Sequence, residues 1–289
     1  MKRLMTLVML SFTTWLLAQN QRFVYEYRWI QDSTSKEKIS EEIMYLDISP
    51  KGSKYYSYGK YKSDSIVEAQ IQKQFATKST DVRIDMSGIK VGKVGYIVEK
   101  TYPDFEIQFF NSISSDKYLV KENLKINWEI LPDKEKIGEF DAQKAKTQLW
   151  GRTWYAWFAT EIPVVDGPYK FHGLPGLIVK VEDATGSHKM ELKASKSLAK
   201  DQEWKSEAEQ SGSKKYIPIK REQYKKAISD YRKDPIKSFR MLNQSGNFMV
   251  KDASGNPIDT NEFIRKRESE AKEAIKRNNN LIELDLLAP

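Results

Sequence analysis

The sequence of 289 residues contains no cysteine and only two histidines. Without cysteine the chain can form no disulfide, no thiolate metal site, no nucleophilic thiol and no lipid-modified cysteine near its N-terminus. The histidines, His172 and His188, flank one predicted strand and have no HExxH-type spacing, so we do not expect them to share an ion. We therefore predict no metal site, no cofactor and no zinc-dependent hydrolase.

The chain also lacks a linker rich in proline, serine or glycine, and its most apolar run is short. This run, at residues 7–17, follows Lys2 and Arg3 and ends at Ala18 before a polar sequence. It is shorter than the about 20 apolar residues of a membrane-spanning helix, and it has the organisation of a secretory signal. We predict a signal peptide at residues 1–18, cleavage after Ala18, and a single mature domain at residues 19–289 without a transmembrane segment.

Charge of one sign is not concentrated in any part of the chain. The formal net charge of +8 falls to +6 when Lys2 and Arg3 are removed with the signal. Residues 189–226 alternate lysine with glutamate and aspartate, which is typical of a solvated face. Nucleic-acid binding requires basic residues gathered on one face with aromatic residues among them, so we expect no nucleic-acid partner.

Alternation of apolar and polar residues with a period of two predicts most of the secondary structure. It recurs at residues 23–29, 43–48, 96–102, 105–109, 126–130, 150–159, 177–182 and 190–194, with short polar gaps typical of antiparallel hairpins. Helical patterns are fewer, at residues 65–77 with a capping box at Ser65 and Glu68, at 219–233, and at 261–277 after Asp259. The pattern predicts a mainly β, α+β fold: a large curved antiparallel sheet with a few helices packed on one face.

The block at residues 150–183 combines an aromatic strand with two turns and an apolar run. In its strand, Trp154 and Phe158 alternate with Tyr155 and Trp157, which indicates a strand covered on both faces. The sequence leaves two interpretations open for this aromatic content: an ordinary sheet core, or a groove that binds an apolar ligand through Tyr155 and Trp157.

Glycine and proline define the turns of this block. Gly167 and Pro168 reverse the chain once, and Gly173, Pro175 and Gly176 reverse it again. In the segment 174–177 the proline fits the second position of a type II turn, and the glycine fits the third position, where φ is positive. Nothing in residues 173–178 can donate a proton, bind a metal or attack a substrate, so we expect a structural role for these turns and no catalytic residue among them.

The block resembles the signature of the GLPGLI family, envelope proteins of Bacteroidota-type bacteria. The resemblance lies in the hexapeptide GLPGLI at residues 173–178, in GRTWYAWF at 151–158, in EIP at 161–163 and in the ending NNNLIEL at 278–284. The resemblance implies an exported envelope protein, often associated with outer-membrane receptor systems, and the family has no established biochemical activity. At the level of fold alone, the expected sheet is also similar to the half-barrel carriers that move lipoproteins across the periplasm.

From these observations we expect a non-enzymatic protein of the periplasm or the cell exterior that binds an apolar small molecule or an outer-membrane protein. Two alternatives remain open. Glu161, Asp166, Glu182 and Asp183 cluster in sequence and could support a carboxylate-dependent hydrolase. The protein could also be a structural accessory of an outer-membrane receptor system, without any small ligand.

Overall fold

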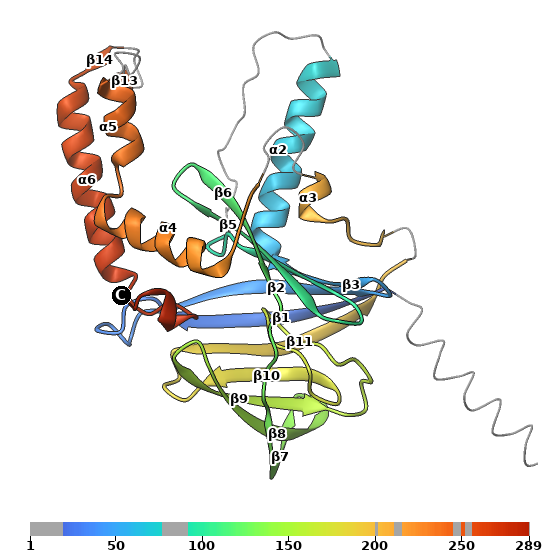
Figure 1. The fold of residues 1–289 in the computed structure, drawn as a ribbon. Helices are drawn as coiled ribbons and strands as arrows, with labels where there is room; N and C mark the ends of the chain where they lie inside the picture. Colours follow the sequence, from blue (N-terminus) through green and yellow to red (C-terminus); the bar gives the residue numbers. More distant parts are fainter. Residues whose placement is uncertain are drawn as a thin grey trace, which may run out of the picture.

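A computed structural model describes residues 20–76, 92–199, 202–210, 216–244, 250–251 and 256–288. The predicted signal peptide lies outside the described residues. The described chain forms a mainly β structure around one open 12-stranded sheet, in which β12 and β7 are the edges and no pairing closes a barrel. Figure 1 shows this sheet curving beneath the helices. The predicted mainly β class, with a large curved sheet and a few helices, is therefore confirmed.

The sheet has the strand order β12-β6-β5-β4-β3-β2-β1-β11-β10-β9-β8-β7. Neighbouring strands pair antiparallel, except that β12 runs parallel to β6. The strands are β1 (Gln21–Ile30), β2 (Ile39–Ser49), β3 (Gly52–Ser57), β4 (Ile97–Thr101), β5 (Glu106–Ile113), β6 (Asp116–Glu122), β7 (Glu129–Ile137), β8 (Phe140–Leu149), β9 (Arg152–Ala159), β10 (Leu177–Asp183), β11 (His188–Ser197) and β12 (Ile217–Ile219).

The two faces of the sheet carry different side chains because successive strand residues point to opposite faces. One face, called the inner face here, carries the main core, and cross-strand pairs such as Val98 with Phe109 belong to it. The opposite, outer face carries a smaller buried cluster at its β3–β6 end: Tyr56, Ile97, Phe110 and Leu119.

The helices agree with the sequence pattern at two of the three predicted places. Helix α4 (Arg221–Lys233) and helix α6 (Thr260–Arg277) lie where they were predicted, and the Asp259 side chain accepts from the Asn261 N–H at 2.9 Å as the expected cap. The remaining elements are α3 (Glu207–Gln210), α5 (Lys237–Gln244), the 3-10 helix η2 (Leu284–Leu286) and a hairpin of β13 (Val250–Lys251) with β14 (Pro257–Ile258).

Helix α2 (Tyr58–Ala76) begins earlier than predicted. Ser57 accepts from the Lys60 N–H at 3.0 Å and so caps the helix, which shows that the predicted capping box at Ser65 was wrong. The error arose because the tyrosine-rich sequence before Ser65 has no clear helical periodicity.

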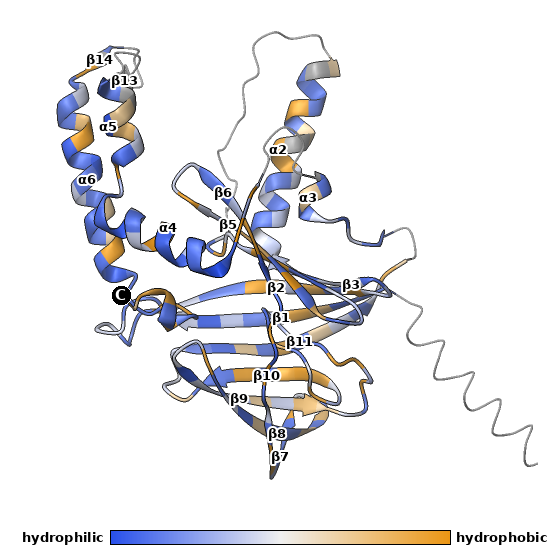
Figure 2. Ribbon diagram, viewed as in Figure 1, coloured by the Kyte–Doolittle hydropathy of each residue, from blue (hydrophilic) through white to orange (hydrophobic). Residues whose placement is uncertain are grey.

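Helix α4 packs on the inner face of the sheet, whereas helix α2 packs on the outer face, where Tyr61 contacts Tyr56, so the expectation that the helices share one face was wrong. The Tyr224 ring meets the Phe109 ring edge to face at 5.7 Å, and the Tyr224 hydroxyl accepts from Asn111 Nδ2 at 2.7 Å. Helix α6 is hydrophilic along most of its length (Figure 2), and Ile264 is its one buried side chain. Within the described ranges, no helix combines the length and apolar character needed to cross a bilayer.

The strand predicted at residues 150–159 is β9, which begins at Arg152, two residues later than predicted. Trp150 and Gly151 have φ values of 55° and 76° and form the two-residue connection of a hairpin, because Leu149 pairs with Arg152. The Trp150 side chain is nevertheless buried and packs against Tyr169 and Phe171 on the inner face. A hairpin turn therefore contributes one of the largest side chains of the core.

Candidate functional site

A cavity of about 490 Å³ lies between the inner face of the sheet, helix α4 and the C-terminal residues. We call it the inner cavity. Its volume falls within the roughly 300 to 1,000 Å³ typical of small-molecule sites. Aromatic side chains from five separate parts of the chain form much of its wall: Tyr27, Trp29, Tyr96, Phe109, Tyr169, Tyr224 and Tyr231.

Strand alternation explains how these aromatic rings gather. Tyr27 and Trp29 are two residues apart on β1, so both stand on the inner face, where their rings stack with centroids 4.7 Å apart. Just before β4, Tyr96 packs on Phe109 at 5.8 Å and on Tyr169 at 5.2 Å. Two groups of packed aromatic rings, one on β1 and one around Tyr96 and Phe109, therefore form much of the wall.

The cavity wall also contains a buried hydroxyl that the fold leaves unpaired. The Tyr96 hydroxyl is inaccessible to solvent and has no hydrogen-bond partner among the described residues. Burial raises the pKa of Tyr96, so the phenol stays protonated. An unpaired buried hydroxyl lowers the free energy of unfolding by about 1 to 3 kcal/mol, so the wall is not optimised for stability at Tyr96.

His188 occupies a fixed, uncharged state at the border of the cavity. Its Nε2 lies 2.9 Å from the Asn280 carbonyl oxygen, which can only accept, so Nε2 carries the proton. Its Nδ1 then accepts from the Tyr27 hydroxyl at 2.7 Å. Burial, reinforced by the positive charge of Arg152, lowers the pKa of His188 to about 4. His188 is therefore a neutral structural link between β1, β11 and the C-terminal residues.

Residues 278–286, called the C-terminal segment here, close one side of the inner cavity. Arg152 at the start of β9 anchors this segment. Its Nη2 donates to Asn280 Oδ1 and to the Leu281 carbonyl, both at 2.6 Å, and its Nη1 donates to Asp183 at 3.0 Å. Asn280 Nδ2 also donates to the Ile30 carbonyl at 2.8 Å. The GRTW sequence thus contributes the residue that holds the chain's C-terminal part.

A second buried cluster fixes the other end of the C-terminal segment. Glu283 is 1% exposed and accepts from the Tyr169 hydroxyl at 2.7 Å and from Arg221 Nη1 at 2.7 Å. Lys170 Nζ lies 2.7 Å from Glu283 and 2.5 Å from Glu122. Burial opposes ionisation of Glu283, but the charges of Lys170 and Arg221 outweigh it and lower the pKa of this carboxyl. The block at residues 150–183, called the signature block here, thus makes a second contact with the C-terminal segment through Tyr169 and Lys170.

The turn glycines of the signature block sit where a side chain would collide or strain the backbone. A Cβ on Gly176 would lie 2.3 Å from the Ala159 carbonyl oxygen, and one on Gly167 would lie 2.8 Å from Ile178 Cβ. Gly173 and Gly176 have φ values of 93° and 153°. At the first turn, the Pro168 carbonyl accepts from the Phe171 N–H at 3.2 Å.

The segment 174–177 is not the type II turn that the sequence predicted. The Gly176 N–H donates to the Leu174 carbonyl at 2.8 Å, which closes a tighter three-residue turn around Pro175. The Leu177 N–H donates instead to the Ile162 carbonyl at 3.1 Å. The bend that follows β9 therefore accepts the hydrogen bond that a type II turn would have kept local, and the sequence could not reveal that competition.

Tyr155 and Trp157, the predicted ligand-binding pair, lie on the outer face and do not line the inner cavity. Trp157 is 4% exposed because lysines on both neighbouring strands cover it: Lys180 Nζ is 3.9 Å and Lys144 Nζ 5.2 Å from its ring centre. Lys144 also lies 4.6 Å from the Tyr155 ring. Their role in binding stays a prediction.

The four carboxylates that cluster in sequence are not brought together as a catalytic group. Asp166 is fully buried, forms an ion pair with Lys100 and accepts a hydrogen bond from the Tyr102 hydroxyl. Asp183 pairs with Arg152. Glu161 is exposed, and Glu182 pairs with Lys180 at 3.4 Å. His172 is separate from His188 and stacks on Phe105 with centroids 4.7 Å apart. No group of three or more potential metal ligands occurs in the described part of the chain.

The comparisons with known proteins concern a short stretch and the fold. A family model described as "Protein of unknown function (Porph_ging)" matches residues 151–180. No curated protein matches the chain. Two solved structures, titled "Structure of PNGF-II in P21 space group" and "Structure of PNGF-II in C2 space group", are similar at 16% sequence identity, with TM-scores of 0.47 and 0.48. The similarity covers 74% of this chain and 34% of each of those chains, so the chain spans about a third of their length.

Sequence reasoning missed the residues that connect the signature block with the C-terminal segment: Arg152, Lys170, Arg221 and Glu283. Arg152 and Lys170 carried a usable signal, because each is a lone charge inside an aromatic or apolar run. A charge in such a run requires a buried partner. The identity of the partners, which lie between 31 and 129 positions away, could not be read from the sequence.

Proposed function

We propose that this protein is a non-enzymatic binding protein that holds an apolar or amphipathic small molecule in the inner cavity. The supporting observation is the aromatic wall of a cavity of about 490 Å³, closed by the C-terminal segment. Aromatic rings offer large apolar contact area, and a few polar groups at the wall orient the ligand.

The chemistry of the wall favours binding over catalysis. Three ionisable groups that line the cavity are engaged in structural contacts: His188 with Tyr27 and Asn280, Glu283 with Tyr169 and Arg221, and Arg232 with the Asn278 and Ile275 carbonyls. A catalytic acid or base needs a proton-transfer partner on the substrate, and these groups already have protein partners. The inner cavity thus matches a carrier or receptor for an uncharged molecule.

We further propose that the protein belongs to the GLPGLI family and is exported to the periplasm or the cell exterior. The family-model match at residues 151–180 supports this placement, since it overlaps the block that carries the resemblance. The signal at residues 1–18 supports export. An outer-membrane protein that receives or delivers the bound molecule is the partner we propose.

Two measurements test the binding function. Mass spectrometry of a denatured extract of the purified protein should detect a co-purifying apolar molecule. Titration with the uncharged dye Nile red should show saturable fluorescence. Ile228→Trp fills the cavity from helix α4 and should abolish dye binding, whereas Lys226→Trp, an exposed position on the same helix that does not line the cavity, should not. Equal binding by both variants would refute the proposal.

A further inference from the structure

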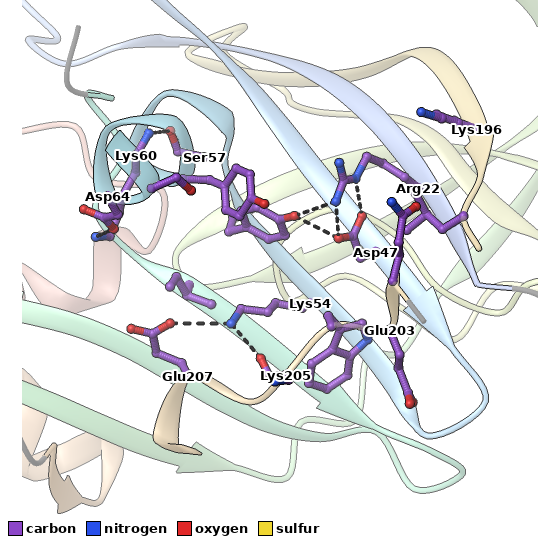
Figure 3. A pocket seen from close by; sticks show the side chains of 17 residues that line it. Arg22, Asp47, Lys54, Ser57, Lys60, Asp64, Lys196, Glu203, Lys205 and Glu207 are labelled. Atoms are coloured by element: carbon purple, nitrogen blue, oxygen red, sulfur yellow. Dashed lines mark hydrogen bonds and ion pairs between the residues drawn. The ribbon is translucent and has the colours of Figure 1, made fainter. Parts of the chain in front are cut away.

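A second cavity, of about 460 Å³, lies on the outer face of the sheet. We call it the outer pocket. Its floor comes from β1, β2, β3, β4 and β11, one side from the first turns of α2, and the other side from the chain that leads to α3 (Figure 3). Arg22 and Tyr56 line it, and both stand on the face opposite Tyr25 and Tyr55 of the main core. The sheet itself therefore separates the outer pocket from the inner cavity.

The floor of the outer pocket holds a rigid polar cluster. Arg22 donates to both oxygens of Asp47, at 2.7 and 2.8 Å, and to the Tyr56 hydroxyl at 3.0 Å. The Tyr56 hydroxyl in turn donates to Asp47 at 2.8 Å. Arg22 Nη1 makes no hydrogen bond within the described chain, so its N–H groups remain for a ligand.

Cationic and anionic side chains alternate around the walls. Lys54 is buried, and its Nζ donates to the Lys205 carbonyl at 2.9 Å and to the Glu207 carboxylate at 3.5 Å (Figure 3). Lys60 pairs with Asp64 at 2.6 Å on helix α2. The five basic residues of the lining, which include Lys196, are offset by four carboxylates, which include Glu203. The pocket presents donors and acceptors in nearly equal number and has little net charge.

Aromatic rings complete the outer pocket. Tyr61 is 50% exposed, and its ring lies 5.7 Å from that of Tyr56. Trp204 belongs to the chain that leads to α3. Its position is fixed because its Nε1 donates to the Gly52 carbonyl at 3.3 Å and Lys51 Nζ lies 4.9 Å from its ring centre. The pocket therefore offers flat apolar faces beside its polar groups.

We propose that the outer pocket binds a neutral saccharide unit, at a site distinct from the inner cavity. Sugar hydroxyls both donate and accept, so they can pair with the cations and the carboxylates of the lining at the same time. The C–H groups on the face of a sugar ring pack on the electron-rich faces of aromatic rings. The five basic residues and four carboxylates leave little net charge to select an anion, and the polar lining offers a purely apolar ligand little matching surface.

Saturation-transfer NMR on the full chain tests this proposal with D-glucose, D-galactose, D-mannose, N-acetyl-D-glucosamine and their common disaccharides as probes, and with inorganic phosphate as the anionic competitor. We expect transfer to at least one sugar at millimolar concentration and no competition by phosphate. Absence of transfer to every sugar, or displacement of the sugar by phosphate, would overturn the proposal.

Two matched pairs of variants locate the site. Tyr61→Ala should weaken sugar binding by about tenfold or more, and Tyr58→Ala, on the same helix but outside the lining, should change it less than about twofold. Arg22→Gln should abolish binding, and Arg28→Gln, farther along β1 outside the lining, should not. Equal effects within either pair would place the sugar elsewhere. Tyr61→Ala should leave Nile red binding unchanged, so that failure at this site is distinguishable from failure at the inner cavity.

Discussion

Arg152 and Leu281 are 129 positions apart, yet the Arg152 guanidinium holds the Leu281 carbonyl through Nη2 at 2.6 Å and through Nε at 3.2 Å. This contact joins the first residue of β9 to the C-terminal segment. It gives the signature block a role that its turns alone do not explain: the block is the surface on which the end of the chain docks, and the docked segment closes the inner cavity.

Loss of the Arg152 side chain should destabilise the protein strongly. Arg152→Gln leaves Asp183 buried without its cationic partner and removes the bonds to Asn280 and Leu281. Breaking a buried pair by removing one partner costs about 3 to 5 kcal/mol. Urea unfolding measures the loss. Arg28→Gln, which breaks an exposed pair with Glu26, should cost at most about 1 kcal/mol and serves as the control.

Gly176→Ala should destabilise the protein by more than about 1 kcal/mol, because the new Cβ would lie 2.3 Å from the Ala159 carbonyl oxygen. Gly186→Ala is a matched control. Gly186 has a φ of 70° but no atom within 4 Å of an added Cβ, so it reports backbone strain alone. Pro175→Ala should cost less than Gly176→Ala. Melting midpoints that fall equally for Gly176→Ala and Gly186→Ala would show that the close approach at Gly176 has no consequence.

His188 should make stability depend on pH in a mildly acidic window. Its pKa falls from 6.5 in the unfolded chain to about 4 in the fold, chiefly through burial. The unfolded chain therefore binds more protons between these values, and stability decreases as pH falls from 6.5 toward 4. The total effect is on the order of 3 kcal/mol. Urea unfolding across this range measures the slope. His188→Gln should reduce the slope, part of which remains because burial also lowers the pKa of His172, and an unchanged slope would contradict the assignment.

Tyr96→Phe should leave stability unchanged or raise it by about 1 kcal/mol, since it removes a buried hydroxyl that has no partner. Tyr27→Phe provides the contrast, because the Tyr27 hydroxyl donates to His188 and its loss should be destabilising. Thermal unfolding compares the two variants. A clear loss of stability in Tyr96→Phe would mean that the hydroxyl has found a partner, such as an ordered water.

Trp154 and Trp157 test the two faces of β9. Trp154→Ala opens a cavity in the inner core, where Trp154 is fully buried, and should cost about 3 to 5 kcal/mol. Trp157→Ala removes a ring covered by Lys144 and Lys180 on the outer face and should cost less. Unfolding measures stability, and ligand extraction shows whether Trp157 contacts the bound molecule as the sequence predicts. Equal destabilisation by both variants would mean that the outer face of β9 is as tightly packed as the core.

Local patterns were sufficient wherever a residue's environment follows from its neighbours in sequence. The inward positions of Phe23, Tyr25 and Tyr27 follow from alternation along β1, and Asp259 was recognisable as the cap of α6 from its place before the helical pattern. The start of α2 was misjudged because Ser57 sits at the end of a strand, where strand and helix signals overlap.

The sequence by itself determined the fold class, the hairpin between β10 and β11, and the need for glycine in the turns of the signature block, because strand alternation and backbone sterics act over a few residues. Tertiary structure alone decided that Lys170 and Arg221 share Glu283, that Ile162 beyond the end of β9 accepts the hydrogen bond of Leu177, and that aromatic rings from β1, the approach to β4 and α4 line one cavity. These relationships join positions separated by many residues, and only the folded sheet brings them within contact distance.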